Sequence, residues 1–395
     1  MTGELTAGGT SPSTTRLLGI ARALVVPVVL VVVLGVIAPM VLTEFRLNLL
    51  GKFLCFAILA IGVDLIWGYT GMLSLGHGVW FGLGGYALAM HLKLVAAADL
   101  GDPMPDFMTW SGLKELPALW APFSNVYFAL VAVVVLPAVV AFLLGLLVFR
   151  SRVKGAYFSI ITQALALSVT ILIIGQQGYT GGMNGLTSFS TLFGLPLVKP
   201  ETQWLLYQVT VGALVVTYLL GRWVTHSPLG RLMIAIRDDE DRVRFAGYDV
   251  AKIKAGVFAL SAAIAGVAGA LFAPQVGIIS PANMDIVPSI EFVLLVAVGG
   301  RGTLIGPIIG ALLVGGARSA LSENFPATWQ YFYGLLFVGS VLFFPSGLVG
   351  FVRNPSVDLT LVRRLLGRPE GEVAATPVSM PGAPGAEAQG AGRAE

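Results

Sequence analysis

The sequence predicts an all-α integral membrane protein, a polytopic bundle of about ten transmembrane helices. Of its 395 residues, 56% are hydrophobic and 11% are charged, which is far more apolar than the surface of a soluble protein tolerates. The apolar residues form continuous runs long enough to cross a bilayer core of about 30 Å. A membrane β-barrel would instead show alternating segments of about ten residues. The sequence therefore excludes both a soluble protein and a barrel.

The first apolar run resembles a secretory signal peptide, because Arg16 and Arg22 precede the segment from Ala23 to Ala38. The run continues to Leu42, however, and no small-x-small cleavage site follows it. We therefore expect a first transmembrane helix over residues 18–42, preceded by a cytoplasmic segment over residues 1–17.

Nine further apolar runs complete a predicted transmembrane domain over residues 18–351. The eighth of the ten runs, residues 286–299, is short. Only Gly299-Gly300-Arg301-Gly302 separates it from the ninth run, which is typical of a half-helix or a re-entrant piece. Between eight and ten spans are therefore expected. The nine runs cover residues 49–67, 72–92, 124–149, 156–174, 203–221, 255–277, 286–299, 303–320 and 329–350.

Basic residues predict that both termini face the cytoplasm. With a cytoplasmic N-terminus, all but six of the 24 Lys and Arg residues fall on the cytoplasmic side. The net charge of +3 is then explained by this bias, and no nucleic-acid partner is expected. Residues 352–395, rich in Ala, Gly, Pro and Glu, predict a disordered cytoplasmic tail. The six outer residues are Arg46, Lys52, Lys93, Lys114, Lys199 and Arg318.

Two predicted outer segments are long, residues 93–123 and residues 175–203. The first contains Trp110 and Trp120 together with four prolines and is expected to form a small ordered cap. Its aromatic residues are either an interfacial belt or contacts for an extracytoplasmic partner.

The chain lacks the motifs of an enzyme that hydrolyses ATP or binds a metal. No glycine-rich loop ends in Gly-Lys-Ser/Thr. Cys55 is the sole cysteine, and His77, His91 and His226 are too dispersed for a zinc motif. We expect neither catalysis nor a cofactor in this chain, so energy for any work must come from a partner.

The connection over residues 222–254 is the most informative polar stretch, because its charges describe a short self-capped helix. Acidic residues come first and basic residues last, which complements the helix dipole. Gly247 lies where a left-handed residue ends a helix, and Tyr248 is placed to pack on Val243. A helix of about nine residues is unstable alone. It must therefore dock, either on the bundle or on a cytosolic partner.

This connection resembles the coupling loop of ABC importer permeases of the branched-chain amino acid and urea group. In that group a short cytoplasmic helix followed by glycine fits a groove on the ATPase. The usual Glu-Ala-Ala start is absent here, and DEDRVRFAG stands before Tyr248. The resemblance implies a coupling helix over residues 236–248. It assigns contact with the ATPase to Ile236, Arg237, Asp238, Asp239, Glu240, Asp241, Arg242, Val243, Arg244, Phe245, Gly247 and Tyr248.

Three further strings carry the same resemblance: GYTGMLSLGHG (residues 68–78), TGGMNGL (180–186) and VGGRGTLIGPIIGA (298–311). It covers residues 49–350, and the outer segment looks like the C-type permease subunit of the urea branch. The resemblance implies import of urea or a small amide across a bacterial inner membrane, with branched-chain amino acids as the alternative solute. The partners it implies are a second permease subunit, two cytosolic ATPases that bind ATP and Mg²⁺, and an extracytoplasmic binding protein.

The glycine-rich strings also allow two physical interpretations. Pairs spaced four apart, Gly78 with Gly82, Gly181 with Gly185 and Gly306 with Gly310, are typical of tight helix packing in membranes. Alternatively, GYTGMLSLGHG and TGGMNGL are broken-helix or re-entrant elements whose free backbone groups line a polar cavity.

Polar residues within or beside the spans are candidates for a substrate pathway, because charge in hydrocarbon is costly. The alternative for Asp64, His77 and Glu291 is structural pairing. Ser159, Thr162 and Gln163 share one helical face and are expected to form one polar group with Gln176, Gln177 and Asn184. The candidates are Asp64, Tyr69, Ser74, His77, Ser159, Gln163, Asn184 and Glu291.

Two other functions compete with an importer. In a secondary transporter or channel, Asp64, His77 and Glu291 would carry protons or line a pore. In a membrane enzyme, His77 would act as a base oriented by Asp64, although no nucleophile accompanies them.

Overall fold

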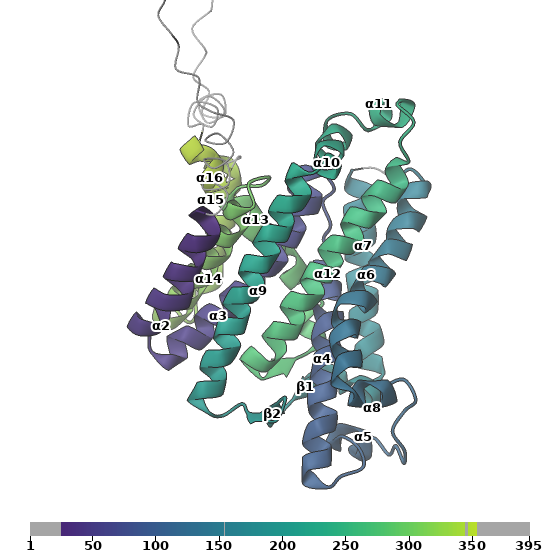
Figure 1. Ribbon diagram of the computed structural model, residues 1–395, viewed down its shortest axis with the longest axis vertical. Coiled ribbons are helices and arrows are strands. Elements are labelled where there is room, and N and C mark those ends of the chain that lie inside the picture. Colours follow the sequence, from purple (N-terminus) through teal and green to yellow (C-terminus); the bar gives the residue numbers. More distant parts are fainter. Residues whose placement is uncertain (1–24, 154, 344–346, 354–395) are drawn as a thin grey trace, which may run out of the picture.

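The computed structural model describes residues 25–153, 155–343 and 347–353, and these form a helical bundle (Figure 1). Among them, eight helices are long and apolar enough to cross a membrane, and a shorter apolar helix covers Val25–Val41. The predicted fold class is confirmed. Residues 1–17 and almost all of the predicted tail lie outside the described residues.

The boundaries of the long helices follow the apolar runs to within eight residues, the largest difference being at the end of α4. The shorter first helix includes η1 (Val31–Ile37) and α2 (Ala38–Val41). The eight long spans are α3 (Glu44–Asp64) with η2 (Leu65–Tyr69), α4 (His77–Leu100), α6 (Val126–Arg150), α7 (Ala156–Gly175), α9 (Pro200–His226), α12 (Val250–Val276), η5 (Pro281–Asn283) with α13 (Ile286–Gly299), and α14 (Ile305–Asn324).

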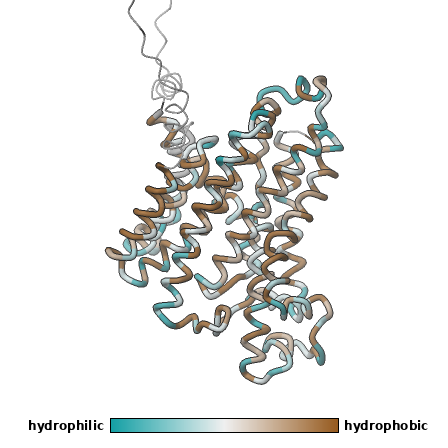
Figure 2. The backbone as a smooth tube through the Cα atoms, in the orientation of Figure 1, coloured by the Kyte–Doolittle hydropathy of each residue, from teal (hydrophilic) through white to brown (hydrophobic). Residues whose placement is uncertain are grey.

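Short elements mark the two ends of the bundle. One end carries α10 (Pro228–Asp238), α11 (Glu240–Phe245) and α16 (Gly347–Arg353), and we call it the coupling end (Figure 1). The opposite, or cap, end carries the remaining short helices and two small antiparallel sheets. In Figure 2 hydrophilic segments gather at both ends, while the long helices between them are mostly hydrophobic. The cap-end elements are α5 (Asp106–Trp110), η3 (Ala121–Ser124), α8 (Gln177–Thr180), η4 (Gly182–Asn184), β1 (Leu186–Thr187) paired with β4 (Ile278–Ile279), and β2 (Thr191–Leu192) paired with β3 (Leu195–Pro196).

Helix α12 forms the centre of the bundle and packs along α6, α4 and α3. Its glycines allow this, because a Cβ at Gly266 would meet the backbone of Val133 and one at Gly269 would meet the carbonyl of Phe81. Small residues permit such backbone contact between membrane helices. Helices α3 and α4 are mostly buried, whereas α6 and α7 are mostly exposed within this chain.

Two segments without α-helix connect consecutive spans inside the bundle. Residues 70–76 connect η2 to α4 without helix, and residues 277–285 connect α12 to α13 through β4 and η5. Helix α4 starts deep inside the bundle, because its first residue, His77, bonds Ser261, which lies about 16 Å along α12. The starts of α4 and α13 meet where the Gly78 amide donates to Ser289 Oγ at 3.1 Å. GYTGMLSLGHG thus contains a non-helical segment inside the bundle, as the broken-helix interpretation expects, and the predicted short eighth helix is confirmed.

The predicted glycine pairs differ in their roles. Gly306 and Gly310 pack against the backbone of α13, as expected. Gly181 and Gly185 lie outside any long helix with φ angles of +78° and +68°, so helix packing was the wrong prediction there. These two residues serve a turn that needs left-handed backbone.

Four of the six basic residues assigned to the outer side lie inside helices. Arg46 and Lys52 belong to α3, Lys93 to α4 and Arg318 to α14. Arg46 and Lys93 lie in helix ends that extend beyond the predicted runs 49–67 and 72–92. Lys52 and Arg318 lie within the predicted runs 49–67 and 303–320 themselves. The predicted outer segment 93–123 accordingly begins within α4.

Trp329–Phe343, labelled α15, corresponds to the tenth predicted run but is shorter than the eight spans. Helix α16 follows α15 in the chain, after residues 344–346, which lie outside the described residues. Gly347 lies against the backbone of Gly300, next to the turn between α13 and α14. This contact places α16 at the coupling end.

Candidate functional site

The coupling end is built from two helices, so the single helix predicted over residues 236–248 is wrong. Helix α10 stops at Asp238, and Asp239 adopts extended angles (φ −156°, ψ 94°) before α11 begins. The cause is the Asp239 side chain, which caps α11 by accepting a hydrogen bond from the Arg242 amide at 3.1 Å.

The end of α11 agrees with the sequence. Gly247 has a φ of +90°. Its amide donates to the Arg244 carbonyl at 3.0 Å, and the Tyr248 amide donates to the Val243 carbonyl at 3.4 Å. These two bonds form a Schellman motif. Arg244 also pairs with Glu240 at 2.8 Å, which joins the acidic start of α11 to its basic end.

One face of α10 and α11 docks on the bundle. Ile236 and Val243 are buried in a small cluster with Val250 at the start of α12. Lys254 of α12 pairs with Glu240 at 2.6 Å while 8% of its side chain is exposed. Because a buried charge requires a partner, this ion pair fixes α11 to α12.

A second attachment joins α10 to the broken segment. Arg237 Nη1 donates to the Gly68 carbonyl at 2.8 Å, and a Cβ at Gly71 would meet the Arg237 side chain. The Gly68 carbonyl belongs to η2, directly before residues 70–76. The connection between α9 and α12 is thus bonded to the end of the second span, directly before residues 70–76.

The opposite face of this connection is free. Phe245 is 90% exposed, and Tyr248 and Arg242 are also exposed. Phe245 and Tyr248 together give this face exposed aromatic surface, and aromatic residues are enriched at protein interfaces. Docking on the bundle and contact with a partner are therefore compatible, because they use different faces.

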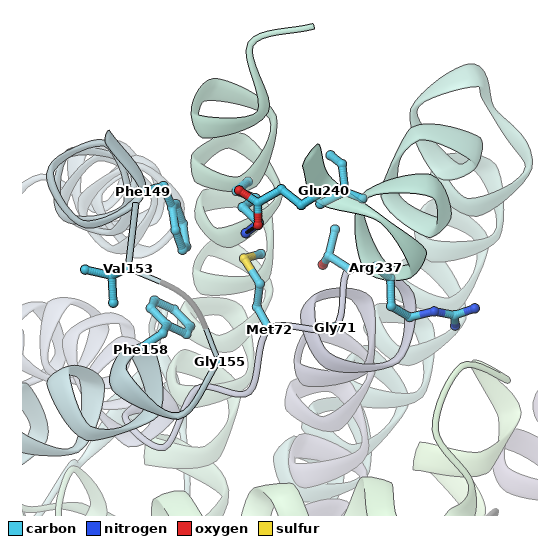
Figure 3. Close-up of a pocket in the computed structure, with 11 residues that line it drawn as sticks. Gly71, Met72, Phe149, Val153, Gly155, Phe158, Arg237 and Glu240 are labelled. Atoms are coloured by element: carbon cyan, nitrogen blue, oxygen red, sulfur yellow. Dashed lines mark hydrogen bonds and ion pairs between the residues drawn. The ribbon is translucent and has the colours of Figure 1, made fainter. Parts of the chain in front are cut away.

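A cavity of about 190 Å³ separates the broken segment from α10 and α11. Figure 3 shows Phe149 and Phe158 on one side and Arg237 and Glu240 on the other, with Met72 between them. Thr70 and Gly71 complete this part of the lining. The cavity leaves space for the two helices to move against the broken segment.

His77 and Ser74 belong to a buried polar chain at the start of α4. His77 Nε2 lies 2.9 Å from Ser261 Oγ, and its Nδ1 lies 3.1 Å from Ser74 Oγ. Since Ser261 Oγ donates to the Gly62 carbonyl at 2.6 Å, it accepts from Nε2, which makes Nε2 the protonated nitrogen. All of these side chains are fully buried.

Asp64 is held by backbone amides of the turn between α13 and α14. Its carboxylate accepts from Gly302 at 2.5 Å and from Leu304 at 3.2 Å. Neither bond involves His77, so the proposed base and orienter are wrong. Together with Glu291, which bonds Arg318, these residues form three separate hydrogen-bond networks among the described residues.

Two side chains of α7 hold the broken segment in extended form. Ser159 Oγ donates to the Leu73 carbonyl at 2.6 Å, and the Leu75 amide donates to Thr162 Oγ at 3.0 Å. Gln163 is half-buried and makes no hydrogen bond with any described residue. The polar backbone of residues 70–76 thus runs along α7 and is bonded to its side chains.

The expected polar group along α7 is wrong, because the helix separates its members. Thr162 lies near the start of α7, and Gln177 follows its end about 22 Å away. Asn184 belongs instead to a cap-end cavity of about 160 Å³, which Trp110 and Gln177 also line. Tyr69 is half-buried in η2, near Thr225 of α9.

An ion pair fastens the cap to α4. Lys93 Nζ lies 2.9 Å from Asp106 Oδ1, and 9% of the lysine side chain is exposed. Partial burial raises the pKa of Asp106, but the hydrogen bond and charge of Lys93 outweigh it, so that pKa lies below the usual aspartate value. The carboxylate therefore stays charged at neutral pH.

We predict that Asp106→Asn loosens the cap. A carboxylate with a lowered pKa stabilises the folded cap above its unfolded pKa of about 3.9, and this contribution is lost as the pH falls through the lower folded value. Cleavage at residues 101–125 by a protease should be unchanged between pH 7 and pH 5. The variant should be cleaved about two- to fivefold faster at both values.

Asp102→Asn is the matched control, since Asp102 is exposed and forms no ion pair with a described residue. Equal cleavage of the two variants would contradict the role of the Lys93–Asp106 pair.

A bundle with broken spans, joined to a docked helical connection outside the membrane, defines a transport permease. Residues 45–341 match the family described as branched-chain amino acid transport system / permease component. The chain belongs to this family, and it is a multi-pass permease of the bacterial inner membrane.

Individual relatives support this assignment. The chain is 28% identical to the high-affinity branched-chain amino acid permease LivM of Escherichia coli K12, over 82% of this chain and 75% of the relative. It is 24% identical to the high-affinity branched-chain amino acid permease BraD of Pseudomonas aeruginosa, over 77% of this chain and 93% of the relative. The ribose import permease RbsC of Escherichia coli K12 is 27% identical over 50% and 62%. No solved structure matches the chain.

Two functional candidates were missed in the sequence: Lys52 and Arg318, which lie within the predicted runs 49–67 and 303–320 but were counted only as basic residues of the outer side. Both lie within apolar helices. Their positions beside runs of hydrophobic residues were the available signal, since an ionisable residue inside a span indicates function by default.

Proposed function

We propose that this chain is one permease subunit of an ATP-driven importer in which α10 and α11 transmit the movement of a cytosolic ATPase to residues 70–76. The observation that carries the proposal is the 2.8 Å bond from Arg237 to the Gly68 carbonyl. It joins the connection outside the membrane directly to a break inside it.

The proposed movement follows a continuous set of contacts. Force on the exposed face of α11 reaches α12 through the Glu240–Lys254 pair and reaches η2 through Arg237. Helix α12 in turn contacts the start of α4 through Ser261 and His77. Rigid elements joined by hydrogen bonds are able to carry such coupling, and the cavity beside them provides room for it.

The partners follow from what this chain does not carry. Its sequence has no phosphate-binding loop, so ATP and Mg²⁺ are bound by two partner ATPases in this proposal. A second permease subunit covers exposed faces of this bundle, where α6 and α7 are mostly exposed. A binding protein delivers solute at the cap end, which is then extracytoplasmic.

A branched-chain amino acid is the proposed solute. The relatives LivM and BraD are named for this class. Urea is the second candidate, favoured by the resemblance of residues 106–123 and of IRDDEDRVRF (236–245) to the urea branch. Its neutral hydrogen-bonding groups would suit the backbone of residues 70–76.

Uptake by cells tests the proposal. Cells with and without this chain are given labelled leucine or labelled urea at low concentration, and the same strains are tested after deletion of the partner ATPases. We expect leucine uptake to fall to background in both deletions. Persistent uptake without the ATPases would contradict the importer, while selective loss of urea uptake would exchange the solute and keep the architecture.

A further inference from the structure

A group of charged and aromatic side chains lies inside the cap-end half of the membrane bundle, around the Glu291–Arg318 pair. Helix α3 starts at the cap end and ends at the coupling end. Lys52 lies about 12 Å after the first residue of α3 and therefore in the cap-end half. Arg318 lies about 9 Å before the cap-end terminus of α14. Glu291 follows the start of α13 by five residues. We call these three residues the charged cluster.

The charged cluster contains one satisfied ion pair. Arg318 Nη1 donates to both carboxylate oxygens of Glu291, at 2.6 and 2.8 Å. Glu291 is largely buried, with 16% of its side chain exposed, whereas Arg318 is 40% exposed. The same guanidinium lies 5.2 Å from the ring centre of Trp329. Arg318 is therefore fixed in orientation by two contacts, while its Nη2 and Nε donors have no described acceptor.

Lys52 remains without a counter-ion. Among the described residues no carboxylate lies within ion-pair distance of its ammonium group, although Arg318 and Glu291 act on it electrostatically. Its Nζ instead lies 5.9 and 6.0 Å from the ring centres of Phe56 and Phe272. The charged cluster thus carries one positive charge in excess, next to aromatic rings and within helices expected to cross a membrane.

Such a site is costly unless something completes it. Charged residues at membrane depth face polar cavities or partners rather than lipid, and a cation–π contact compensates a lysine charge only in part. The nearby Gln275 strengthens the argument. A Cβ at Gly51, the neighbour of Lys52, would meet the amide nitrogen of Gln275, and that nitrogen is buried without a hydrogen-bond partner. The site therefore offers several hydrogen-bond donors to an anion.

We propose that the charged cluster binds the carboxylate of a transported solute, with Lys52 as its main contact and the free edge of Arg318 as its second. This inference rests on the proposed import function and names its substrate class as a small carboxylate with an apolar side chain. Lysine and arginine are the usual partners of carboxylates. The rings of Phe56 and Phe272, stacked with centres 5.6 Å apart, provide apolar surface beside the cation. A neutral solute such as urea would leave the lysine uncompensated.

The test measures binding to the complete transporter, including its partner subunits, in detergent and without the extracytoplasmic binding protein. Omitting that protein removes its own selectivity from the result. The probes are leucine and leucinamide, which differ in the carboxylate. We expect Lys52→Met to raise the Kd for leucine about tenfold, to change that for leucinamide less than about twofold, and Lys52→Arg to retain most leucine binding.

Lys199→Met is the matched control, because Lys199 is exposed outside the spans, and it should bind both probes like the parent. Unchanged leucine binding by Lys52→Met would overturn the inference. Equal weakening for both probes would also overturn it, since it would indicate a structural role or an anionic partner group at this position. If the parent transporter imports leucine with ATP while Lys52→Met binds normally, only this inference fails. If the parent imports no leucine, the proposed solute fails as well.

Discussion

Replacing Gly269 with leucine is expected to prevent stable assembly of the bundle, whereas the same replacement at Gly256 on the same helix should be tolerated. A Cβ at Gly269 would meet the Phe81 carbonyl oxygen and lie 3.1 Å from the Gly85 amide nitrogen. Both are backbone atoms of α4, so no rotamer change relieves the clash. The expected loss of stability is at least about 3 kcal/mol, at the upper end of overpacking effects.

Gly256 is a matched control because no described atom lies within 4 Å of a Cβ built there. The measurement is the amount of protein in the membrane together with the thermal unfolding temperature after extraction in detergent. Normal abundance and an unchanged unfolding temperature for Gly269→Leu would contradict the close approach of α4 and α12. A milder Gly269→Ala variant should lie between the two.

This close approach also shows what the sequence could predict. Apolar continuity located the spans, because any helix crossing a bilayer needs a run of that length. Local motifs were equally informative: Gly247 ended α11 as predicted, and GYTGMLSLGHG marked the break between η2 and α4. These features depend on neighbouring residues, so they can be read from a single chain.

Side-chain partners from distant segments were not predictable in this way. Asp64 is bound by amides 238 and 240 residues further along the chain, and Glu291 is paired with an arginine on the next helix. Such contacts are decided by how helices rotate and approach, which no local pattern specifies. The break at Asp239 was missed for a related reason, since an aspartate suits both a first helical turn and a cap.

Arg237→Ala is expected to abolish most transport while leaving the amount of protein in the membrane unchanged. The substitution removes the charge-assisted bond to the Gly68 carbonyl, and such bonds contribute about 1.5–3 kcal/mol. Because this bond joins α10 to the broken segment, its loss should lower ATP-driven uptake at least about tenfold. ATP hydrolysis by the complete transporter should continue, since the exposed face of α11 with Phe245 is unaltered.

Arg231→Ala provides the control, because Arg231 is an exposed arginine on the same helix and forms no ion pair with a described residue. It removes an equal charge from α10 without touching η2. We expect Arg237→Ala to hydrolyse ATP but to lose uptake, and Arg231→Ala to retain both activities. This result would separate the transmission of movement from the docking of the ATPase. Equal uptake by both variants would show that α10 does not act through Gly68. Movement would then enter the bundle through α12, by the ion pair of Glu240 with Lys254 and the buried cluster of Ile236, Val243 and Val250.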